Sequence, residues 1–397
     1  MENFVCPICG NIDTKYIGYR NGKPYCRKCI TFRGQEAIGD FRQSESADYA
    51  LHYELSGDQK RLSKELVYNF THGIDSLVHA VCGSGKTEIV LEVISYAIKH
   101  NLKVGFAVPR RDVIRELYLR FKSIFENNKV VSVYGGHAFK LEGDLICLTT
   151  HQLFRYPGYF DLLILDEIDA FPYNGNDVLD AFFKRAVRGH YILLSATPSK
   201  EVIKVFSENE KRILNLNKRF HSHPLPVPRF SLHTGVMRYY HLIQELRRFL
   251  AQNKPIFVFS PTIDACEQTF DVLRLLFKNT DFVHSKCPDR SERIEKFRKG
   301  TTKILVTTAV LERGVTVKDL QVIIFGADHP LYTSAALIQI SGRVGRKKDA
   351  PTGEVVFIAK RETKEMVEAV NEIKLANKSL FSYINCGRKH ENWLIFS

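Results

Sequence analysis

Short apolar runs alternate with helix-length segments along most of this chain. In the first half the runs are SLVHAVC, KVGFAVP, DLICLTT, DLLILDE and HYILLSATP. Between the first two runs, apolar residues recur at the spacing of one helix face, as Ile89, Val90, Val93, Ile94, Ala97 and Ile98. Unbroken apolar strands separated by helices are typical of a parallel sheet that is covered on both faces. The pattern therefore predicts an α/β domain that begins with a strand, a loop and a helix.

The same alternation returns after a proline-rich segment. The segment KRFHSHPLPVPRF has prolines at positions 224, 226 and 228, which fit neither a helix interior nor a central strand. The runs KPIFVFS, TKILVTT, QVIIFG and EVVFIA follow it. We therefore expect one α/β domain over residues 41–218, a semi-rigid linker over 219–232 and a second α/β domain over 233–397. Residues 1–40 precede these domains as a separate module.

The charge of the chain favours an anionic partner. Its 57 lysine and arginine residues exceed its 44 acidic residues, which gives a net charge of +13 and a pI near 9.2. Such a surface suits nucleic acid or the anionic inner face of a membrane, and the charge alone leaves both open. The sequence contains neither a secretory leader nor an apolar stretch of about 18 residues. We therefore expect a cytosolic chain.

Four of the nine cysteines form two pairs near the N-terminus. Cys6 with Cys9 and Cys26 with Cys29 have the spacing that places four thiolates around one tetrahedral Zn²⁺. A segment this short has too little core to fold without a cross-link, so we expect zinc to be structural. Its basic side chains either contact nucleic acid or are merely solvated. The other cysteines have no paired spacing and are expected to be small buried or incidental thiols: Cys82, Cys147, Cys266, Cys287 and Cys386.

The stretch HAVCGSGKTE, between the first strand and its helix, has the pattern of a phosphate-binding loop. Ala80, Gly85, Lys86 and Thr87 match that pattern except that alanine replaces the first glycine. Glycines let backbone N–H groups approach phosphates, the helix N-terminus favours negative charge, the lysine reaches the terminal phosphates and the threonine binds Mg²⁺. The nucleotide-binding residues predicted here are Cys82, Gly83, Ser84, Gly85, Lys86 and Thr87.

An acidic pair at the end of another predicted strand supports this interpretation. In LLILDEIDAF, Asp166 is placed to hold Mg²⁺ through water, and Glu167 is placed to polarise the attacking water. Ordinary carboxylates at a strand end are the alternative. Beside a phosphate loop, the pair predicts a nucleotide hydrolase in which Lys86, Asp166 and Glu167 are catalytic.

Four further stretches resemble motifs of the superfamily 2 helicases: LLSATPS, FVFSPT, VTTAVLERGVTV and QISGRVGR. The resemblance implies two tandem RecA-like domains, with ATP as the nucleotide. In QISGRVGR, Arg343 and Arg346 are spaced to project from one short helical face. By the resemblance they are also catalytic, because arginines from a second domain stabilise charge on a phosphoryl group when the domains close. The alternative is two surface arginines in a basic loop.

The resemblance assigns further residues to the nucleotide and to its coupling with DNA. Gln59 takes the position of a glutamine that recognises adenine, although a lone glutamine on a helix is usually solvated. Gly314 lies in a segment that contacts both nucleotide and strand. Ser195 and Thr197 match the motif that relays closure between the ATP and DNA sites, and they could instead satisfy backbone groups at a strand end.

Several loops after the predicted strands correspond to those with which superfamily 2 proteins hold a sugar-phosphate backbone. Hydroxyls and helix N-termini there bind phosphates without reading bases, which predicts little sequence preference and affinity that falls with salt. An ordinary surface role is an equal alternative for any single residue. The predicted DNA contacts are Arg110, Arg111, Gly135, Gly136, Thr149, Thr150, His151, Ser260, Thr307 and Thr308.

The stretches DEIDAFPY, RFHSHPLPVP, AVCGSGKTE and QISGRVGR, with a four-cysteine module before them, resemble the ComFA family of late competence proteins over essentially the whole chain. The resemblance implies a DNA-stimulated ATPase at the cytoplasmic face of the membrane that helps import transforming single-stranded DNA. It implies ComEC, ComFC and a recombination mediator as partners, and it leaves peripheral membrane association and oligomerisation open. Two alternatives are a duplex-unwinding helicase of replication restart or repair, and a non-motor, ATP-gated DNA-binding scaffold.

Overall fold

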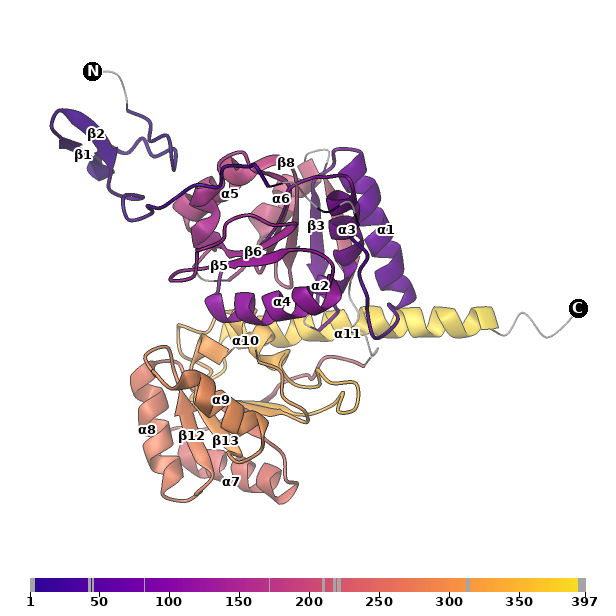
Figure 1. The fold of residues 1–397 in the computed structure, drawn as a ribbon. Coiled ribbons are helices and arrows are strands. Elements are labelled where there is room, and N and C mark those ends of the chain that lie inside the picture. The colour runs from indigo at the N-terminus through magenta and orange to yellow at the C-terminus, as the bar shows by residue number, and fades with distance from the viewer. Residues whose placement is uncertain are drawn as a thin grey trace, which may run out of the picture. The chain divides into compact units, whose positions relative to one another are not determined.

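The computed structural model divides into two compact units, each built on a parallel sheet (Figure 1). The first unit comprises Met1–Ala80 and Gly85–Leu216, and the second comprises Val81–Ser84 and Asn217–Ser397. Within the described residues, no helix combines the length and the apolar character that crossing a membrane requires. The structure describes residues 4–41, 44, 46–81, 83–170, 172–208, 211–216, 219, 223–311 and 315–391, with side chains as far as residue 378.

The N-terminal module is a small hairpin. A 3₁₀ turn, η1 (Thr14–Tyr16), leads into β1 (Ile17–Arg20), which pairs antiparallel with β2 (Lys23–Cys26). Asn21 and Gly22 join the strands with φ of 49° and 73°. Two successive left-handed residues match the twist of a hairpin, and asparagine followed by glycine adopts them readily. The hairpin brings the second cysteine pair back beside the first.

A seven-stranded parallel sheet forms the centre of the first unit, in the order β5-β6-β4-β7-β8-β3-β9. Its strands are β3 (Ser76–Ala80), β4 (Val104–Val108), β5 (Val130–Val133), β6 (Leu145–Thr149), β7 (Phe160–Asp166), β8 (Val187–Ser195) and β9 (Arg212–Leu216). Its helices are α1 (Gly57–Thr71), α2 (Lys86–Ile89), α3 (Leu91–Lys99), α4 (Arg111–Ile124), the 3₁₀ segment η2 (Thr150–Arg155), α5 (Asp177–Ala186) and α6 (Lys200–Glu208).

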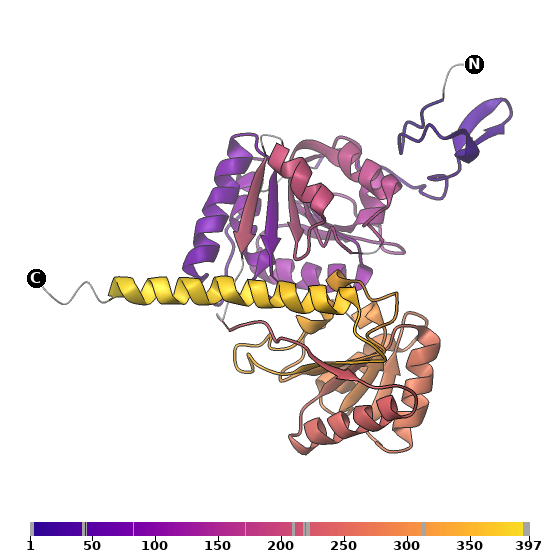
Figure 2. The ribbon, with the colours of Figure 1, turned by 180° about the vertical axis from the view of Figure 1, so that it is seen from behind.

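Alternate strand positions divide the core of the first unit into two layers. Phe106 and Ile164 pack with the layer of α1, α3 and α4, whereas Ala107 and Leu165 pack with η2, α5 and α6. Figures 1 and 2 show α1 and α5 on opposite sides of the sheet. Each central strand is therefore buried on both faces, which explains why its sequence is an unbroken apolar run.

The second unit has a six-stranded parallel sheet in the order β10-β15-β14-β11-β13-β12. Helices α7 and α8 cover one face, and α9, α10 and α11 cover the other. The strands are β10 (Arg229–Leu232), β11 (Ile256–Phe259), β12 (Thr280–Val283), β13 (Ile304–Thr307), β14 (Gln321–Phe325) and β15 (Val355–Ala359). The helices are α7 (Met237–Ala251), α8 (Ile263–Arg274), α9 (Arg290–Arg298), the 3₁₀ turn η3 (Ala309–Leu311), α10 (Ser334–Ser341) and α11 (Lys364–Glu391).

The predicted fold class, two parallel-sheet α/β domains after a four-cysteine module, is confirmed. Every apolar run named above forms a strand. The analysis missed β5, β9, β10 and β12, which are the edge strands of the two sheets and have only four or five residues each. The expected linker over residues 219–232 differs in one respect, because its last four residues form β10.

Candidate active site and metal cluster

Parallel strands bring the predicted site residues of the first unit to one edge of its sheet. Strands β7, β8 and β3 are neighbours, and they end at Asp166, Ser195 and Ala80. The acidic pair, the SAT stretch and the phosphate loop therefore begin next to one another. They lie at the carboxyl edge, where open parallel sheets bind their ligands.

The phosphate loop makes two left-handed turns before helix α2. Gly83 and Gly85 have φ of 80° and 84°, a conformation that glycine adopts without strain. Lys86 and Thr87 are the first two residues of α2, in agreement with the predicted loop-to-helix transition. Ser84 is buried. Cys82, which was also predicted to bind nucleotide, lies outside the described residues.

Gln59 lies against the phosphate loop. It is buried in the first turn of α1, where its Oε1 accepts a hydrogen bond of 2.9 Å from the N–H of Ser56. The Ser56 hydroxyl in turn accepts from the N–H of Gln59 at 3.3 Å, which forms a capping box. A Cβ on Gly85 would overlap the Gln59 amide. The structure thus brings Gln59 to the loop, and its recognition of adenine stays a prediction.

Lys86 and Asp166 form an ion pair at the ends of β3 and β7. The Lys86 Nζ lies 3.9 Å from the nearest Asp166 carboxylate oxygen, and the two side chains are only 15% and 12% exposed. Partial burial strengthens the attraction between these charges. The Asp166 carboxylate and the Thr87 hydroxyl are hard oxygen donors of the kind that Mg²⁺ prefers, so the residues present fit this ion.

Glu167 is held in an unusual backbone conformation. Its φ is 61°, and its N–H donates to the carbonyl of Leu194 at 3.0 Å and to the Asp166 carboxylate at 2.8 Å. A left-handed conformation costs a residue with a side chain about 1–2 kcal/mol. Such strain persists where the surroundings fix it, and it is common at functional sites. The predicted water-polarising residue therefore has a fixed backbone between β7 and β8.

Asp169 is a site residue that the sequence analysis missed. Its carboxylate accepts hydrogen bonds from the Ser195 hydroxyl at 2.9 Å and the Thr197 hydroxyl at 2.8 Å. The Thr197 N–H also donates to the Ser195 oxygen at 3.1 Å. The loop after β7 is thereby tied to the loop after β8. The available signal was the second acid in DEID, two residues after Glu167.

A second unforeseen group supports helix α2. The Tyr53 hydroxyl donates to Glu88 at 2.6 Å, and the Arg120 guanidinium contacts the same carboxylate. Burial, followed by the Glu88 carboxylate, raises the pKa of Tyr53 to about 12, so the phenol stays protonated as a donor. Glu88 directly follows Thr87. The group therefore fixes the short helix that carries Lys86.

The two predicted arginines of the second unit differ in environment. Arg343 is 2% exposed, and its Nη1 donates to the carbonyl of Val315 at 2.9 Å. Arg346 is half-buried and bonds through Nε to the carbonyl of Gly342 at 3.0 Å. Arg346 is thus the more accessible of the two. Gly314, predicted to contact the nucleotide, lies outside the described residues.

Arg219 fixes the loop that carries Arg346. Its guanidinium donates to the carbonyls of Gly342, Val344 and Gly345 at 3.2, 2.8 and 2.9 Å. Arginine presents its donors in a planar fork that suits several carbonyls at once. The sequence analysis placed this residue in a linker, because contacts between such distant segments leave no periodic signal.

The predicted DNA contacts of the first unit differ in accessibility. Strands β4, β5 and β6 are neighbours, so the loops that follow them begin close together at the carboxyl edge. Thr149 and Thr150 are buried, so a DNA strand would reach only their backbone groups. The predicted contacts that reach the surface are Arg110, Arg111, Gly135 and Gly136.

His151 packs against the N-terminal module. Its ring stacks on Phe32 with 6.0 Å between ring centroids, and Phe32 also meets Phe182 edge-on at 5.0 Å. Burial lowers the pKa of His151, so its ring is neutral at pH 7 and attracts phosphate weakly. The same junction includes a hydrogen bond of 2.7 Å from Arg155 to the carbonyl of Gln35. These contacts favour a packing role for His151.

The predicted DNA contacts of the second unit are mostly internal. Ser260 is buried, and the Thr307 hydroxyl donates to the carbonyl of Val283 at 2.8 Å. Thr308 is partly exposed. The hydroxyl of Thr307 therefore serves the fold, and a strand contact at this position would use the backbone. All three stay predictions.

Phe139 is the most exposed large apolar residue described, at 87%. It follows the predicted contact Gly136 by three positions, and its ring meets that of His137 edge-on at 5.8 Å between centroids. His137 in turn stacks on Tyr134 at 4.9 Å. A bare aromatic ring on a polar loop is a frequent mark of a binding surface. An isolated phenylalanine has no sequence pattern that would reveal its exposure.

The four cysteine sulfurs near the N-terminus lie within 4.8 Å of one another. The Sγ atoms of Cys6 and Cys29 are 3.5 Å apart, and those of Cys9 and Cys26 are 3.6 Å apart. Tetrahedral coordination with Zn–S bonds of about 2.3 Å separates sulfurs by about 3.8 Å. The cluster is compatible with zinc, which would supply a cross-link and, with four protein ligands, no open coordination position.

Comparisons with known proteins agree with this site. The DEAD/DEAH box helicase family matches residues 58–205, and the helicase conserved C-terminal domain matches residues 239–348. Competence protein ComFA of Bacillus subtilis is 32% identical, covering 97% of this chain and 88% of that protein. Competence protein ComFA of Streptococcus pneumoniae is 34% identical, covering 90% of this chain and 86% of that protein.

The fold also has a counterpart among solved structures. S. cerevisiae Dbp5 bound to RNA and ADP BeF3 is similar over 81% of this chain and 91% of that chain, with a TM-score of 0.60 and 16% identity. The two matched domains and the residues at the sheet edge define an ATP-hydrolysing enzyme of the helicase type. Within this class, the chain belongs to the ComFA family of competence proteins.

Zinc content tests the cysteine cluster. We expect the full chain to contain one zinc ion and Cys26→Ser to lose it, because three remaining thiolates hold zinc much more weakly. Cys287→Ser, which changes a thiol outside the cluster, should retain the metal. Elemental analysis of both variants and wild type measures this. Equal zinc in Cys26→Ser and wild type would contradict the assignment.

Proposed function

We propose that this chain is an ATP-driven motor that moves along single-stranded DNA and helps draw transforming DNA into the cell. The observation that carries the proposal is the order of strands in the first unit. Strands β7, β8 and β3 end in the nucleotide residues, and β4, β6 and β5 end in the predicted strand contacts. Strand β4 lies directly beside β7. Both sets of loops therefore share one edge of a rigid sheet.

Each nucleotide residue has a distinct proposed role. Lys86 neutralises charge on the terminal phosphates, while Thr87 and Asp166 hold Mg²⁺. Glu167 polarises the attacking water, and its fixed backbone supports an orienting role. Gln59 selects adenine, in keeping with its position beside Gly85.

The second unit contributes the proposed arginine. We assign stabilisation of phosphoryl charge chiefly to Arg346, because Arg343 is buried and bonded to the Val315 carbonyl. Arg219 supports this role by fixing the carbonyls on both sides of Arg346.

Coupling between hydrolysis and movement is assigned to the Asp169 bridge. Asp169 is three residues from Asp166 and accepts hydrogen bonds from Ser195 and Thr197. A change at the phosphate end of the β7 loop is thus transmitted to the β8 loop through two charge-assisted hydrogen bonds. Two discrete arrangements of such a bridge are what a coupled motor requires.

Charge and an exposed ring support a DNA partner. The net charge of +13 suits the phosphate backbone. Phe139 offers a stacking surface that any base accepts, which fits a motor without sequence preference. The names of both relatives indicate competence, which supports DNA uptake as the setting.

Organisation and partners complete the proposal. Residues 1–40 form the zinc module, 41–218 the ATP-binding domain and 233–397 the second helicase domain. The chain acts at the cytoplasmic face of the membrane with ComEC, ComFC and a recombination mediator, which is inherited from the family resemblance. The basic surface is consistent with peripheral attachment to anionic lipid.

ATP hydrolysis with and without oligo-dT tests the function. Wild-type turnover should rise with the strand. Lys86→Ala and Glu167→Gln should each lose roughly a hundredfold, because they remove a phosphate contact and the water-polarising group. The matched controls Lys122→Ala and Glu116→Gln change exposed residues of α4 and should behave as wild type. Equal wild-type turnover with and without DNA would overturn the proposal, and stimulation by duplex alone would favour the unwinding helicase.

Binding to abasic DNA tests Phe139. Phe139→Ala should weaken binding of a 20-nucleotide oligo-dT by about 1 kcal/mol or more, roughly fivefold in Kd, since base stacking is lost. An abasic strand of equal length should bind both proteins alike. Phe139→Trp should restore affinity for oligo-dT, and Leu119→Ala, at another exposed apolar residue, should have no effect. Fluorescence anisotropy gives each Kd, and an equal loss on both strands would contradict stacking.

A further inference from the structure

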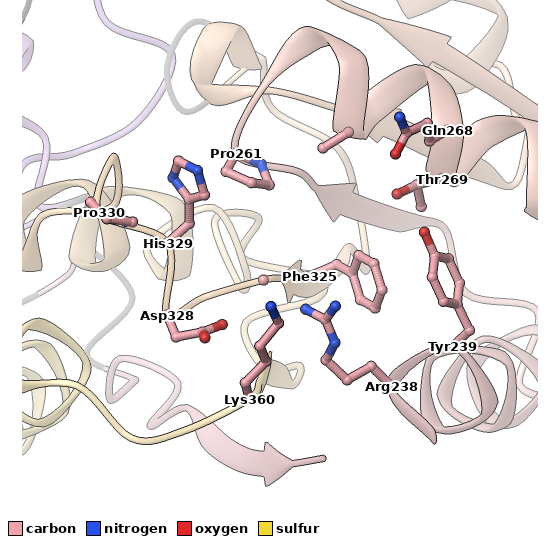
Figure 3. A pocket seen from close by; sticks show the side chains of 12 residues that line it. Arg238, Tyr239, Pro261, Gln268, Thr269, Phe325, Asp328, His329, Pro330 and Lys360 are labelled. Atoms are coloured by element: carbon pink, nitrogen blue, oxygen red, sulfur yellow. The ribbon is translucent and has the colours of Figure 1, made fainter. Parts of the chain in front are cut away.

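A pocket in the second unit involves none of the residues that were predicted to act. It has a volume of about 320 Å³ and lies between α7, α8 and the segments that follow β11, β14 and β15 (Figure 3). This is the carboxyl edge of a parallel sheet, where ligands commonly bind. The volume is at the lower end of the range for small-molecule sites. The lining residues that carry the argument are Arg238, Tyr239, Pro261, Phe325, Asp328 and Lys360.

Positive charge exceeds negative charge in this pocket. Figure 3 shows the ends of Arg238 and Lys360 and the carboxylate of Asp328 facing the same space. Within the described residues, neither Arg238 nor Lys360 forms an ion pair with a carboxylate. The Nε of Arg238 is buried and has no hydrogen-bond partner there. A buried donor without an acceptor costs about 1–3 kcal/mol, which a bound anion would recover.

An aromatic ring fixes the arginine in place. The Arg238 guanidinium lies 5.6 Å from the centroid of Phe325, within the range of a cation–π interaction. The ring of Tyr239 packs against Phe325 with 4.9 Å between centroids. Pro261 adds a further apolar wall. The pocket thus combines an oriented cation pair with an apolar part.

Asp328 distinguishes between classes of anion. A carboxylate ligand such as an acidic peptide offers only acceptors, so it would meet Asp328 as a like charge. A nucleotide offers phosphate oxygens to Arg238 and Lys360, and its base offers N–H donors to Asp328. The mixed chemistry of the pocket therefore favours a nucleotide over an acidic side chain.

We propose that this pocket holds one nucleotide of single-stranded DNA, with its phosphate at Arg238 and Lys360 and its base in the apolar part beside Tyr239. The inference rests on the proposed function, to which it adds a second place where the strand is held. The predicted contacts Ser260 and Thr307 follow β11 and β13, whereas the pocket extends from β11 toward β14 and β15. The strand footprint on the second unit is therefore wider than the helicase motifs indicate.

A charge-matched pair of variants tests the proposal. The test protein is Arg238→Ala/Lys360→Ala, and the control is Arg247→Ala/Lys254→Ala, which also removes one arginine and one lysine. Arg247 and Lys254 lie in the last turn of α7 and just before β11, at the amino edge of the sheet. Binding of fluorescein-labelled oligo-dC is measured by anisotropy with the full chain over a series of salt concentrations. Lys360→Glu alone serves as a further variant, because this side chain is exposed and its change does not threaten folding.

We expect the test protein to bind oligo-dC roughly tenfold more weakly and its salt dependence to fall by about 1.4 in log–log slope, since each phosphate contact on a single strand contributes about 0.7. The control should change both values far less, and Lys360→Glu should bind at least as weakly as the test protein. ATP turnover without DNA should stay at the wild-type level in all of them.

Equal Kd and salt slope in test and control proteins would overturn the pocket assignment while wild-type stimulation by DNA preserves the proposed function. A wild-type ATPase that ignores DNA would instead defeat the proposed function. Decaglutamate is the competitor that separates the ligand classes. Displacement of decaglutamate binding by Arg238→Ala/Lys360→Ala, with oligo-dC binding intact, would assign the pocket to an acidic protein partner and reject the nucleotide.

Discussion

The hydrogen bonds of Asp169 to Ser195 and Thr197 are the interaction on which the rest of the account depends. Strand β8 lies between β7 and β3, so the loop after β8 stands between the Asp166 loop and the Lys86 loop. The bridge closes the space on one side of this gap and fixes its geometry. Without it, an ion pair at one strand end and a hydroxyl pair at the next would be independent features. With it, the state of the phosphate site has a direct mechanical route to a neighbouring loop.

The sequence predicted those features that depend on burial of whole strands or on short-range spacing. Central strands such as β7 are apolar throughout because both faces are covered, and Lys86 and Asp166 follow them at motif spacing. Edge strands such as β12 are mostly half-buried, so their sequences carry a weaker pattern. The burial of Thr149 and the packing of His151 on Phe32 depend on segments far apart in the chain, and so were not foreseen.

The same reason explains the site residues that the sequence did not reveal. The role of Asp169 emerges only when the topology places the β7 loop beside β8, and Arg238 meets Phe325 only after the chain has crossed the second sheet. Both units nevertheless follow one rule, since each presents its chemistry at the carboxyl edge of a parallel sheet. The first unit combines hydrolysis and strand contact there, and the second adds a cationic pocket. A family defined by two such sheets has its chemistry in the loops and its rigidity in the strands.

Movement of a strand by Asp169→Asn is the most direct test of this account. Asparagine keeps the shape of aspartate but replaces one acceptor oxygen with a donor, so it cannot accept both hydroxyl protons as a charged bridge does. The measurement is displacement of streptavidin from biotinylated oligo-dT, taken per ATP hydrolysed in the same reaction. The account predicts that Asp169→Asn hydrolyses ATP in the presence of DNA yet displaces far less streptavidin per ATP than wild type. An unchanged ratio would contradict it.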